Sequence, residues 1–215
     1  MNIYFISGLG ADKRVFSKLV LPPGFESKHI EWVPPLDDES LSSYAGRLVS
    51  QIDTSQPFIL IGLSFGGVVA IEIARIIKPQ MVILISSIQK GSEVPWYFKV
   101  AGTLRIHKII PSFMLRSANS FIYWLFGIKD TEEKQLLKQI LFDTDTRFLR
   151  WAISKIAYWN NREKTEHLFQ IHGTADRLLP LNCTNAHKIV KGGGHFMVLT
   201  KHEEVSCIIS SLLKG

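Results

Sequence analysis

Short apolar runs alternate with stretches of helical spacing over much of the chain. After Ser40, apolar residues recur every three or four positions up to Ile52, which predicts a helix with Ser40 as its N-cap. A second helix, strongly apolar, is predicted over 68–77 because Pro79 cannot continue it. The short apolar runs between such helices are typical of buried strands. The predicted strands are 3–7, 28–33, 58–62, 81–85, 168–172 and 186–190.

This alternation indicates an α/β fold. Strands that are apolar throughout, with helices between them, are typical of a parallel sheet covered on both faces. We therefore predict a mostly parallel sheet of about six strands with helices on both faces. A final helix carries Val205, Ile208, Ile209 and Leu212 on one face. A length of 215 residues fits one domain, 1–215, better than two.

Residues from about 90 to 165 interrupt the alternation with helical periodicity and no strand between. Leu149, Ala152, Ile153 and Ile156 form one apolar stripe there. We expect the segment 90–165 to be a helical insertion between two strands of the sheet. A separate domain with its own core is the alternative, although no linker flanks the segment. Its tryptophans are Trp96, Trp124, Trp151 and Trp159.

Composition and charge are those of an ordinary globular protein, with 46% hydrophobic and 20% charged residues. The 25 basic and 19 acidic side chains give a net charge of +6, but no run of five or six Lys or Arg residues occurs, so we expect no nucleic-acid partner. The N-terminus lacks the basic region of a signal peptide, and no stretch of about 18 apolar residues occurs. We therefore expect a cytoplasmic protein without stable membrane insertion.

The cysteines and glycine-rich loops predict no bound cofactor. Cys183 and Cys207 have neither metal-ligand nor disulfide-framework spacing, and we expect both to be small buried thiols. The loop Gly8-Leu9-Gly10 lacks the third glycine and the lysine of phosphate-binding motifs. The sequence thus implies no metal, nucleotide or prosthetic group. It does not predict an oligomeric state.

The segment Gly62-Leu63-Ser64-Phe65-Gly66 matches the nucleophile-elbow pattern G-x-S-x-G. A predicted strand precedes it and a predicted helix follows, which is the context that the motif requires. Side chains at the two glycine positions would collide where strand turns into helix, so glycine there lets the backbone close and exposes the Ser64 hydroxyl. The alternative is a glycine-rich turn with an idle serine.

A serine hydroxyl needs a base, and in this motif's fold the order is serine, acid, histidine. Among seven histidines, His195 best meets these requirements because it follows three consecutive glycines after a predicted strand. Asp176 comes directly beyond the strand 168–172, where α/β sheets gather reactive groups, and is the predicted acid. Asp143 and Asp145 are weaker alternatives. The other histidines, expected to be surface or core residues, are His29, His107, His167, His172, His187 and His202.

An oxyanion needs backbone donors near the serine. The amide of Phe65, at the start of the predicted helix, is one candidate. The second is the amide of Leu9, in the glycine-rich loop after the first strand. Both residues would act through their backbone N–H groups, so the identity of their side chains does not matter for this role.

Together these segments resemble the α/β-hydrolase superfamily, and more narrowly its small bacterial esterase-type members with a helical cap. The resemblance implies that 90–165 is a cap over the active site. Two departures are the absent opening hairpin and Ser7-Gly8 in place of His-Gly. The serine nucleophile argues against the dehalogenase and epoxide-hydrolase branches, which the resemblance implies would carry aspartate. The matching segments are Ser7-Gly8-Leu9-Gly10, Gly62-Leu63-Ser64-Phe65-Gly66-Gly67, Gly173-Thr174-Ala175-Asp176 and Gly194-His195-Phe196.

These residues predict a serine hydrolase that cleaves a small carboxylic ester or thioester through an acyl-enzyme on Ser64. Apolar cap residues suggest an apolar acyl pocket, or simply pack the cap onto the sheet. One alternative keeps the triad but cleaves an amide or an activated C–C bond, since one fold hosts many chemistries. A non-catalytic ligand-binding protein is another. A third is a membrane-surface role, based on Lys99, Arg105, Lys108 and Arg116.

Overall fold

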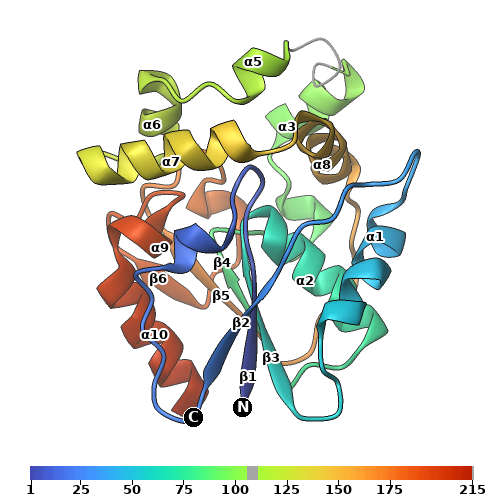
Figure 1. Cartoon of the computed structure of the whole chain (residues 1–215), viewed down its shortest axis with the longest axis vertical. Helices are drawn as coiled ribbons and strands as arrows, with labels where there is room; N and C mark the ends of the chain where they lie inside the picture. The colour runs from blue at the N-terminus through green and yellow to red at the C-terminus, as the bar shows by residue number, and fades with distance from the viewer. Residues whose placement is uncertain (106–110, 215) are drawn as a thin grey trace.

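A single six-stranded sheet forms the centre of the computed structural model, which describes residues 1–105 and 111–214 (Figure 1). Its order is β2-β1-β3-β4-β5-β6, and all five neighbouring pairs are parallel. The prediction of a mostly parallel sheet is confirmed. The strands are β1 (Asn2–Ile6), β2 (Glu26–Ile30), β3 (Phe58–Leu63), β4 (Met81–Ile85), β5 (Leu168–Gly173) and β6 (Lys188–Val190).

Helices cover both faces of this sheet (Figure 1). The α-helices are α1 (Leu41–Leu48), α2 (Phe65–Ile76), α3 (Trp96–Thr103), α5 (Ser112–Leu115), α6 (Ser120–Phe126), α7 (Thr131–Asp143), α8 (Thr146–Tyr158), α9 (Met197–Thr200) and α10 (His202–Lys214). The 3-10 helices are η1 (Lys13–Phe16), η2 (Val49–Gln51), η3 (Gly91–Glu93) and η4 (Leu181–Cys183). Ser40 caps α1 as predicted, accepting a hydrogen bond from the Ser43 amide.

Two hydrophobic cores lie on opposite faces of the sheet because successive strand residues point to opposite sides. Leu60 packs with α1 and α2 in one core, whereas its neighbours Ile59 and Ile61 belong to the other, which includes α9 and α10. Val205 and Ile209 face this second core, as their spacing predicts. Each strand is therefore buried on both sides, which explains its unbroken apolar run.

Strand β2 ends at Ile30, three residues before the predicted end at Val33. Beyond that point, side chains of α1 and η2 take the place of a neighbouring strand as hydrogen-bond partners of the backbone. The Gln51 amide group accepts from and donates to the backbone of Glu31, and the Tyr44 hydroxyl does the same for Val33. Backbone groups satisfied in this way need no strand partner.

The segment between β4 and β5 is helical in its described part, with α3 and α5 to α8, and contains no strand there. Figure 1 places these helices above the sheet, at the end toward which the parallel strands run. Buried side chains of the segment pack into the same two cores: Phe148 and Ile156 into one, Leu137 and Ile140 into the other. His107 and Lys108 lie outside the described residues.

The prediction that both cysteines are buried is wrong. Cys183 is half-buried and Cys207 is exposed, and both are free thiols. On α10, Val205 and Ile209 face the core. Cys207 lies midway between them, and two positions along a helix correspond to about 200° of rotation, so it points to solvent. Within residues 1–105 and 111–214, no helix is long and apolar enough to cross a membrane.

Candidate active site

Ser64 occupies the sharp turn between β3 and α2, with φ 52° and ψ −119°. A non-glycine residue in this region is strained, and the surrounding structure must hold it there. The Ser64 amide donates to the Ile85 carbonyl at 2.9 Å, and the Ser64 carbonyl accepts from Ser87 Oγ at 2.7 Å. The neighbouring strand β4 and the loop after it thus fix the turn. Ser64 Oγ makes no capping bond to α2 and is free for another partner.

The glycines on either side of the serine have no room for a side chain. A Cβ on Gly62 would overlap the backbone of Gly66 and Gly67. A Cβ on Gly66 would overlap the carbonyl oxygens of Ile6 and Ser7 at the end of β1. The structure therefore shows the close backbone contacts that the sequence predicts for this turn.

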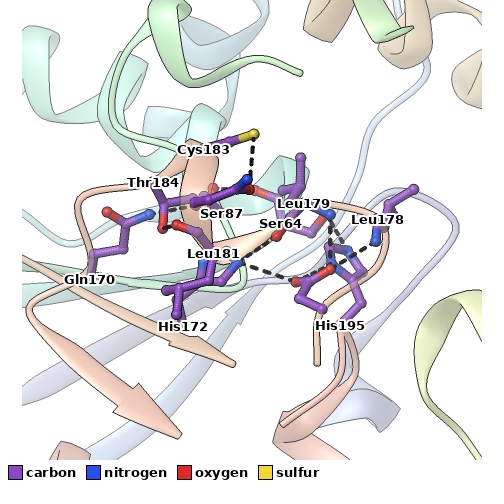
Figure 2. Close-up of polar contacts among 12 residues, drawn as sticks. Ser64, Ser87, Gln170, His172, Leu178, Leu179, Leu181, Cys183, Thr184 and His195 are labelled. Atoms are coloured by element: carbon purple, nitrogen blue, oxygen red, sulfur yellow. Dashed lines mark hydrogen bonds and ion pairs between the residues drawn. The ribbon is translucent and has the colours of Figure 1, made fainter. Parts of the chain in front are cut away.

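His195 lies in the loop between β6 and α9, beside the serine. Its Nε2 is 2.9 Å from Ser64 Oγ, and the ring is only 1% exposed (Figure 2). The ring of Phe126, at the end of α6, packs at a centroid distance of 5.5 Å. The preceding Gly192 has φ +71°, a conformation that glycine adopts without strain. The glycine run thus brings the loop close to β5 and aims the imidazole at the serine.

Asp176 follows β5 and completes a chain of hydrogen bonds. Its Oδ2 accepts from His195 Nδ1 at 2.8 Å, while Oδ1 accepts from the amides of Leu178 and Leu179 at 3.0 and 2.8 Å. Burial alone would raise the pKa of the Asp176 carboxyl, but the charge of His195 and hydrogen bonds from His172, His195 and Leu179 outweigh it and lower the pKa well below its usual range. The ionised carboxylate only accepts, so Nδ1 carries the proton and Nε2 faces the Ser64 hydroxyl as an acceptor.

The two predicted backbone donors flank the serine. Leu9 and Phe65 line the same cavity as Ser64, and neither amide donates to another backbone carbonyl in the described part of the chain. Phe65 is the first residue of α2, where amides have no intrahelical partner. Ser7, which stands where the resemblance implies histidine, donates from Oγ to the Ala11 carbonyl at 2.8 Å and so closes the loop around Leu9.

Comparison with known proteins identifies the family. A model described as the alpha/beta hydrolase family matches residues 3–206. The chain belongs to this family. Its parallel six-stranded sheet with surrounding helices is the α/β-hydrolase fold, and the chain is accordingly a hydrolase of that family. No curated protein matches this α/β hydrolase significantly in sequence.

Solved structures of similar fold include bacterial esterases and a lactonase at low sequence identity. An esterase from Exiguobacterium antarcticum aligns with a TM-score of 0.76 at 15% identity, covering 100% of this chain and 92% of that one. A lipase-esterase related protein from Clostridium acetobutylicum gives 0.76 at 15%, covering 98% and 93%. An enol-lactonase from Burkholderia xenovorans gives 0.71 at 14%, covering 100% and 91%. At sequence identities this low, the structural similarity establishes a shared fold and nothing about the substrate.

His172 is the residue near this site that the sequence analysis did not select. It lies in β5, is fully buried, and places Nε2 2.7 Å from the Leu179 carbonyl and 3.4 Å from Asp176 Oδ2 (Figure 2). The carbonyl only accepts, so Nε2 carries a proton, while Nδ1 has no partner in the described part of the chain. Its position four residues before Asp176 could have indicated a contact with the acid. That contact depends, however, on the loop after β5 folding back over the strand, which the sequence pattern does not show.

We expect His172 to position the acid loop. His172→Leu leaves the buried Leu179 carbonyl without a donor and should lower kcat/KM by about 10-fold to 100-fold, since an unsatisfied buried group costs about 1–3 kcal/mol. His172→Gln keeps a donor near the Nε2 position and should recover activity to within a few-fold of wild type. Kinetics of both variants, with thermal melts to check folding, test this. Equal losses in both variants would contradict the positioning role.

An apolar cavity of about 270 Å³ opens beside the serine of this α/β hydrolase. Its polar side chains are Ser64 and His195, and residues of the loops after the strands, of α2 and of the helical insertion form the remaining wall. The insertion thus supplies much of the surface facing the candidate nucleophile. Its contribution is Phe98, Ala101, Ile122, Leu125, Phe126, Ile153 and Ile156.

The alternative acids have other partners. Asp143 binds Arg14 at 2.7 Å, and Asp145 caps α8 by accepting from the Phe148 amide. The structure brings neither one to His195. Among the described residues, no group of three or more His, Cys, Asp or Glu side chains is placed to hold a metal ion.

Proposed function

We propose that this hydrolase is a serine esterase or thioesterase that cleaves a small-molecule acyl substrate through an acyl-enzyme on Ser64. The observation that carries the proposal is the unbroken line of hydrogen bonds from Ser64 Oγ through His195 to Asp176. Such a line supplies what a hydroxyl nucleophile lacks, a base within reach and a carboxylate that fixes the tautomer of that base.

In the proposed reaction Ser64 Oγ attacks the acyl carbonyl as His195 Nε2 takes its proton. The amides of Leu9 and Phe65 donate to the oxyanion, and one such donor typically contributes about 3 kcal/mol to the transition state. His195 then returns the proton to the leaving alcohol or thiol. Water, activated by the same imidazole, attacks the acyl-enzyme and releases the acid. The lowered pKa of Asp176 keeps that carboxyl ionised throughout the pH range in which imidazole acts as a base.

The helical insertion acts as a cap in this proposal. Its apolar side chains form one wall of the cavity and belong to the same hydrophobic cores as the sheet, which supports one domain with a cap over its site. The cap wall and the sheet loops together offer the acyl chain an apolar environment. Excluding water there would strengthen the hydrogen bonds on the oxyanion.

The experiment that tests this function compares acyl chains in p-nitrophenyl esters. We expect kcat/KM to rise from acetyl to medium chains by up to about fourfold per methylene, the equivalent of about 0.8 kcal/mol. A methoxyacetyl ester, which has the length of butyryl but contains an ether oxygen, should be a poorer substrate after correction for its reaction with hydroxide. Mass spectrometry during turnover should detect the acyl-enzyme.

Two outcomes would overturn the proposal. Equal kcat/KM for the apolar and polar esters would contradict the apolar acyl pocket. Failure of all esters and thioesters with a folded protein would favour a different bond, or the ligand-binding alternative.

A further inference from the structure

A second cavity, of about 280 Å³, lies on the other side of α6 from the serine. Residues of α6 divide between the two cavities: Ile122 and Phe126 face the catalytic one, while Tyr123, Trp124 and the C-cap residue Gly127 face the second. The second cavity is far larger than the share of one water molecule, about 30 Å³. We call it the basic hollow. Its lining is Ser120, Tyr123, Trp124, Gly127, Ile128, Lys129, Lys134 and Arg177.

Three cations and no carboxylate line the basic hollow. Lys129, Lys134 and Arg177 form no ion pair with any described residue. Of the acidic residues that follow along the chain, Glu132 is exposed and does not line the hollow, and the other two are engaged elsewhere. The Asp130 carboxylate accepts from two amides at the start of α7, and Glu133 binds Lys18. The lining of the hollow thus carries positive charge and no carboxylate.

Aromatic rings hold two of these cations in place without neutralising them. The Arg177 guanidinium lies 4.6 Å from the Trp124 ring centroid, and Lys134 Nζ lies 5.8 Å from that of Tyr123. Arg177 Nη1 also donates to the Trp124 carbonyl at 2.6 Å. The other guanidinium nitrogens have no acceptor in the described part of the chain, so they remain available for an anion, which arginine binds through paired N–H groups.

The sequence that leads up to Lys129 of the hollow is poor in acidic residues. Residues 94–129 include lysines and arginines but not one Asp or Glu. Over this length an ordinary composition would include several acidic residues. Of the basic residues in this stretch Lys129 lines the hollow, and the acidic residues begin directly after it with Asp130.

The basic hollow borders the histidine side of the catalytic site. Gly127, which lines the hollow, packs against Gly194, and Phe126 packs on the His195 ring. Arg177 directly follows Asp176. In the proposed reaction His195 gives its proton to the leaving group, so the leaving group departs on this side. The two cavities lie against the same helix, α6, so a ligand that reaches both must pass around it, and the diameter of a helix is about 10 Å.

We propose that the basic hollow binds a phosphate or carboxylate group at the far end of the leaving group of an ester or thioester substrate. The inference rests on the proposed hydrolysis at Ser64 and specifies its substrate class. Such a substrate places an apolar acyl chain in the catalytic cavity, its scissile carbonyl at Ser64, and its anionic group about 10 Å away beyond α6.

The test uses two esters that differ by one phosphate: butyryl 1,8-octanediol monophosphate and butyryl 1,8-octanediol. We expect wild type to prefer the phosphorylated ester by about 10-fold or more in kcat/KM, mainly through KM, because charge-assisted hydrogen bonds hold the phosphate. The double variant Lys134→Gln/Arg177→Gln should lose this preference. The matched control Arg116→Gln/Lys138→Gln removes the same two charges from a different hollow and should retain it.

Binding of octyl phosphate, measured by calorimetry, separates this proposal from the catalytic one. The basic hollow predicts binding by wild type and the control but not by the Lys134→Gln/Arg177→Gln variant, whether or not any ester is hydrolysed. Hydrolysis of both esters at equal kcat/KM in wild type would overturn the leaving-group assignment. Absence of octyl phosphate binding would overturn the anion site. Flotation with phosphatidylglycerol vesicles that depends on Lys134 and Arg177, without preference between the soluble esters, would assign the phosphate to a lipid headgroup instead.

Discussion

Asp176→Asn should lower kcat by about 10⁴-fold, the loss expected when the acid of such a triad becomes an amide. The carboxamide oxygen still accepts from the amides of Leu178 and Leu179, so the loop keeps its shape. Its NH₂ group, however, now faces His195 Nδ1, which must become the acceptor. The ring proton then moves to Nε2, where it points at Ser64 and prevents the imidazole from acting as a base.

Kinetics of Asp176→Asn on a p-nitrophenyl ester measure this effect. Asp143→Asn is the matched control, because Asp143 was the alternative acid and lies in an exposed pair with Arg14. We expect Asp143→Asn to stay within about twofold of wild type, as surface ion pairs contribute little. A variant at position 176 that keeps more than a tenth of the activity would contradict the assignment of the acid.

Gly66→Ala should destabilise the fold by about 3 kcal/mol or more. The added Cβ would overlap the carbonyl oxygens of Ile6 and Ser7, which belong to backbone and cannot rotate away like a side chain. Overpacking of this kind typically costs about 1–3 kcal/mol even where side chains adjust. The shift would also move the loop that carries Leu9, so activity should fall with stability.

Urea unfolding of Gly66→Ala and Gly46→Ala tests the argument. In α1, a Cβ on Gly46 meets nothing closer than Ile76 Cδ1 at 3.7 Å. Alanine there should stabilise the protein by about 0.5–1 kcal/mol because it is the better helix former. The same Gly→Ala change is thus expected to lower the free energy of unfolding at position 66 and to raise it at position 46. Equal urea midpoints for the two variants would show that the backbone around Ser64 accommodates the added Cβ without loss of stability.

Local pattern was sufficient to predict the parallel sheet and most of its strands, and it selected the three residues that the structure joins by hydrogen bonds. The apolar run of β3, the elbow with Ser64, and the helix α2 are consecutive in the chain, so the turn and its glycines follow from neighbours alone. Asp176 and His195 were selected because each follows a predicted strand. In the structure they do lie within hydrogen-bond distance of one another and of Ser64.

Features that depend on distant partners were not predictable in the same way. Strand β2 ends at Ile30, and the backbone after it is satisfied by Tyr44 of α1 and Gln51 of η2 instead of by a neighbouring strand. His172 approaches Asp176 and Leu179 only after the loop beyond β5 folds back over the strand. The strand order and the division of α6 between two cavities are likewise properties of packing, which no local periodicity encodes.

Intact mass after incubation with a fluorophosphonate tests the central claim most directly, because the reagent adds only to an activated serine. We predict one adduct on wild type, none on Ser64→Ala, and much slower labelling of Asp176→Asn, since the hydroxyl then lacks its base. A folded wild type without an adduct would contradict this claim. An adduct of equal mass on Ser64→Ala would place the reactive group elsewhere in the chain.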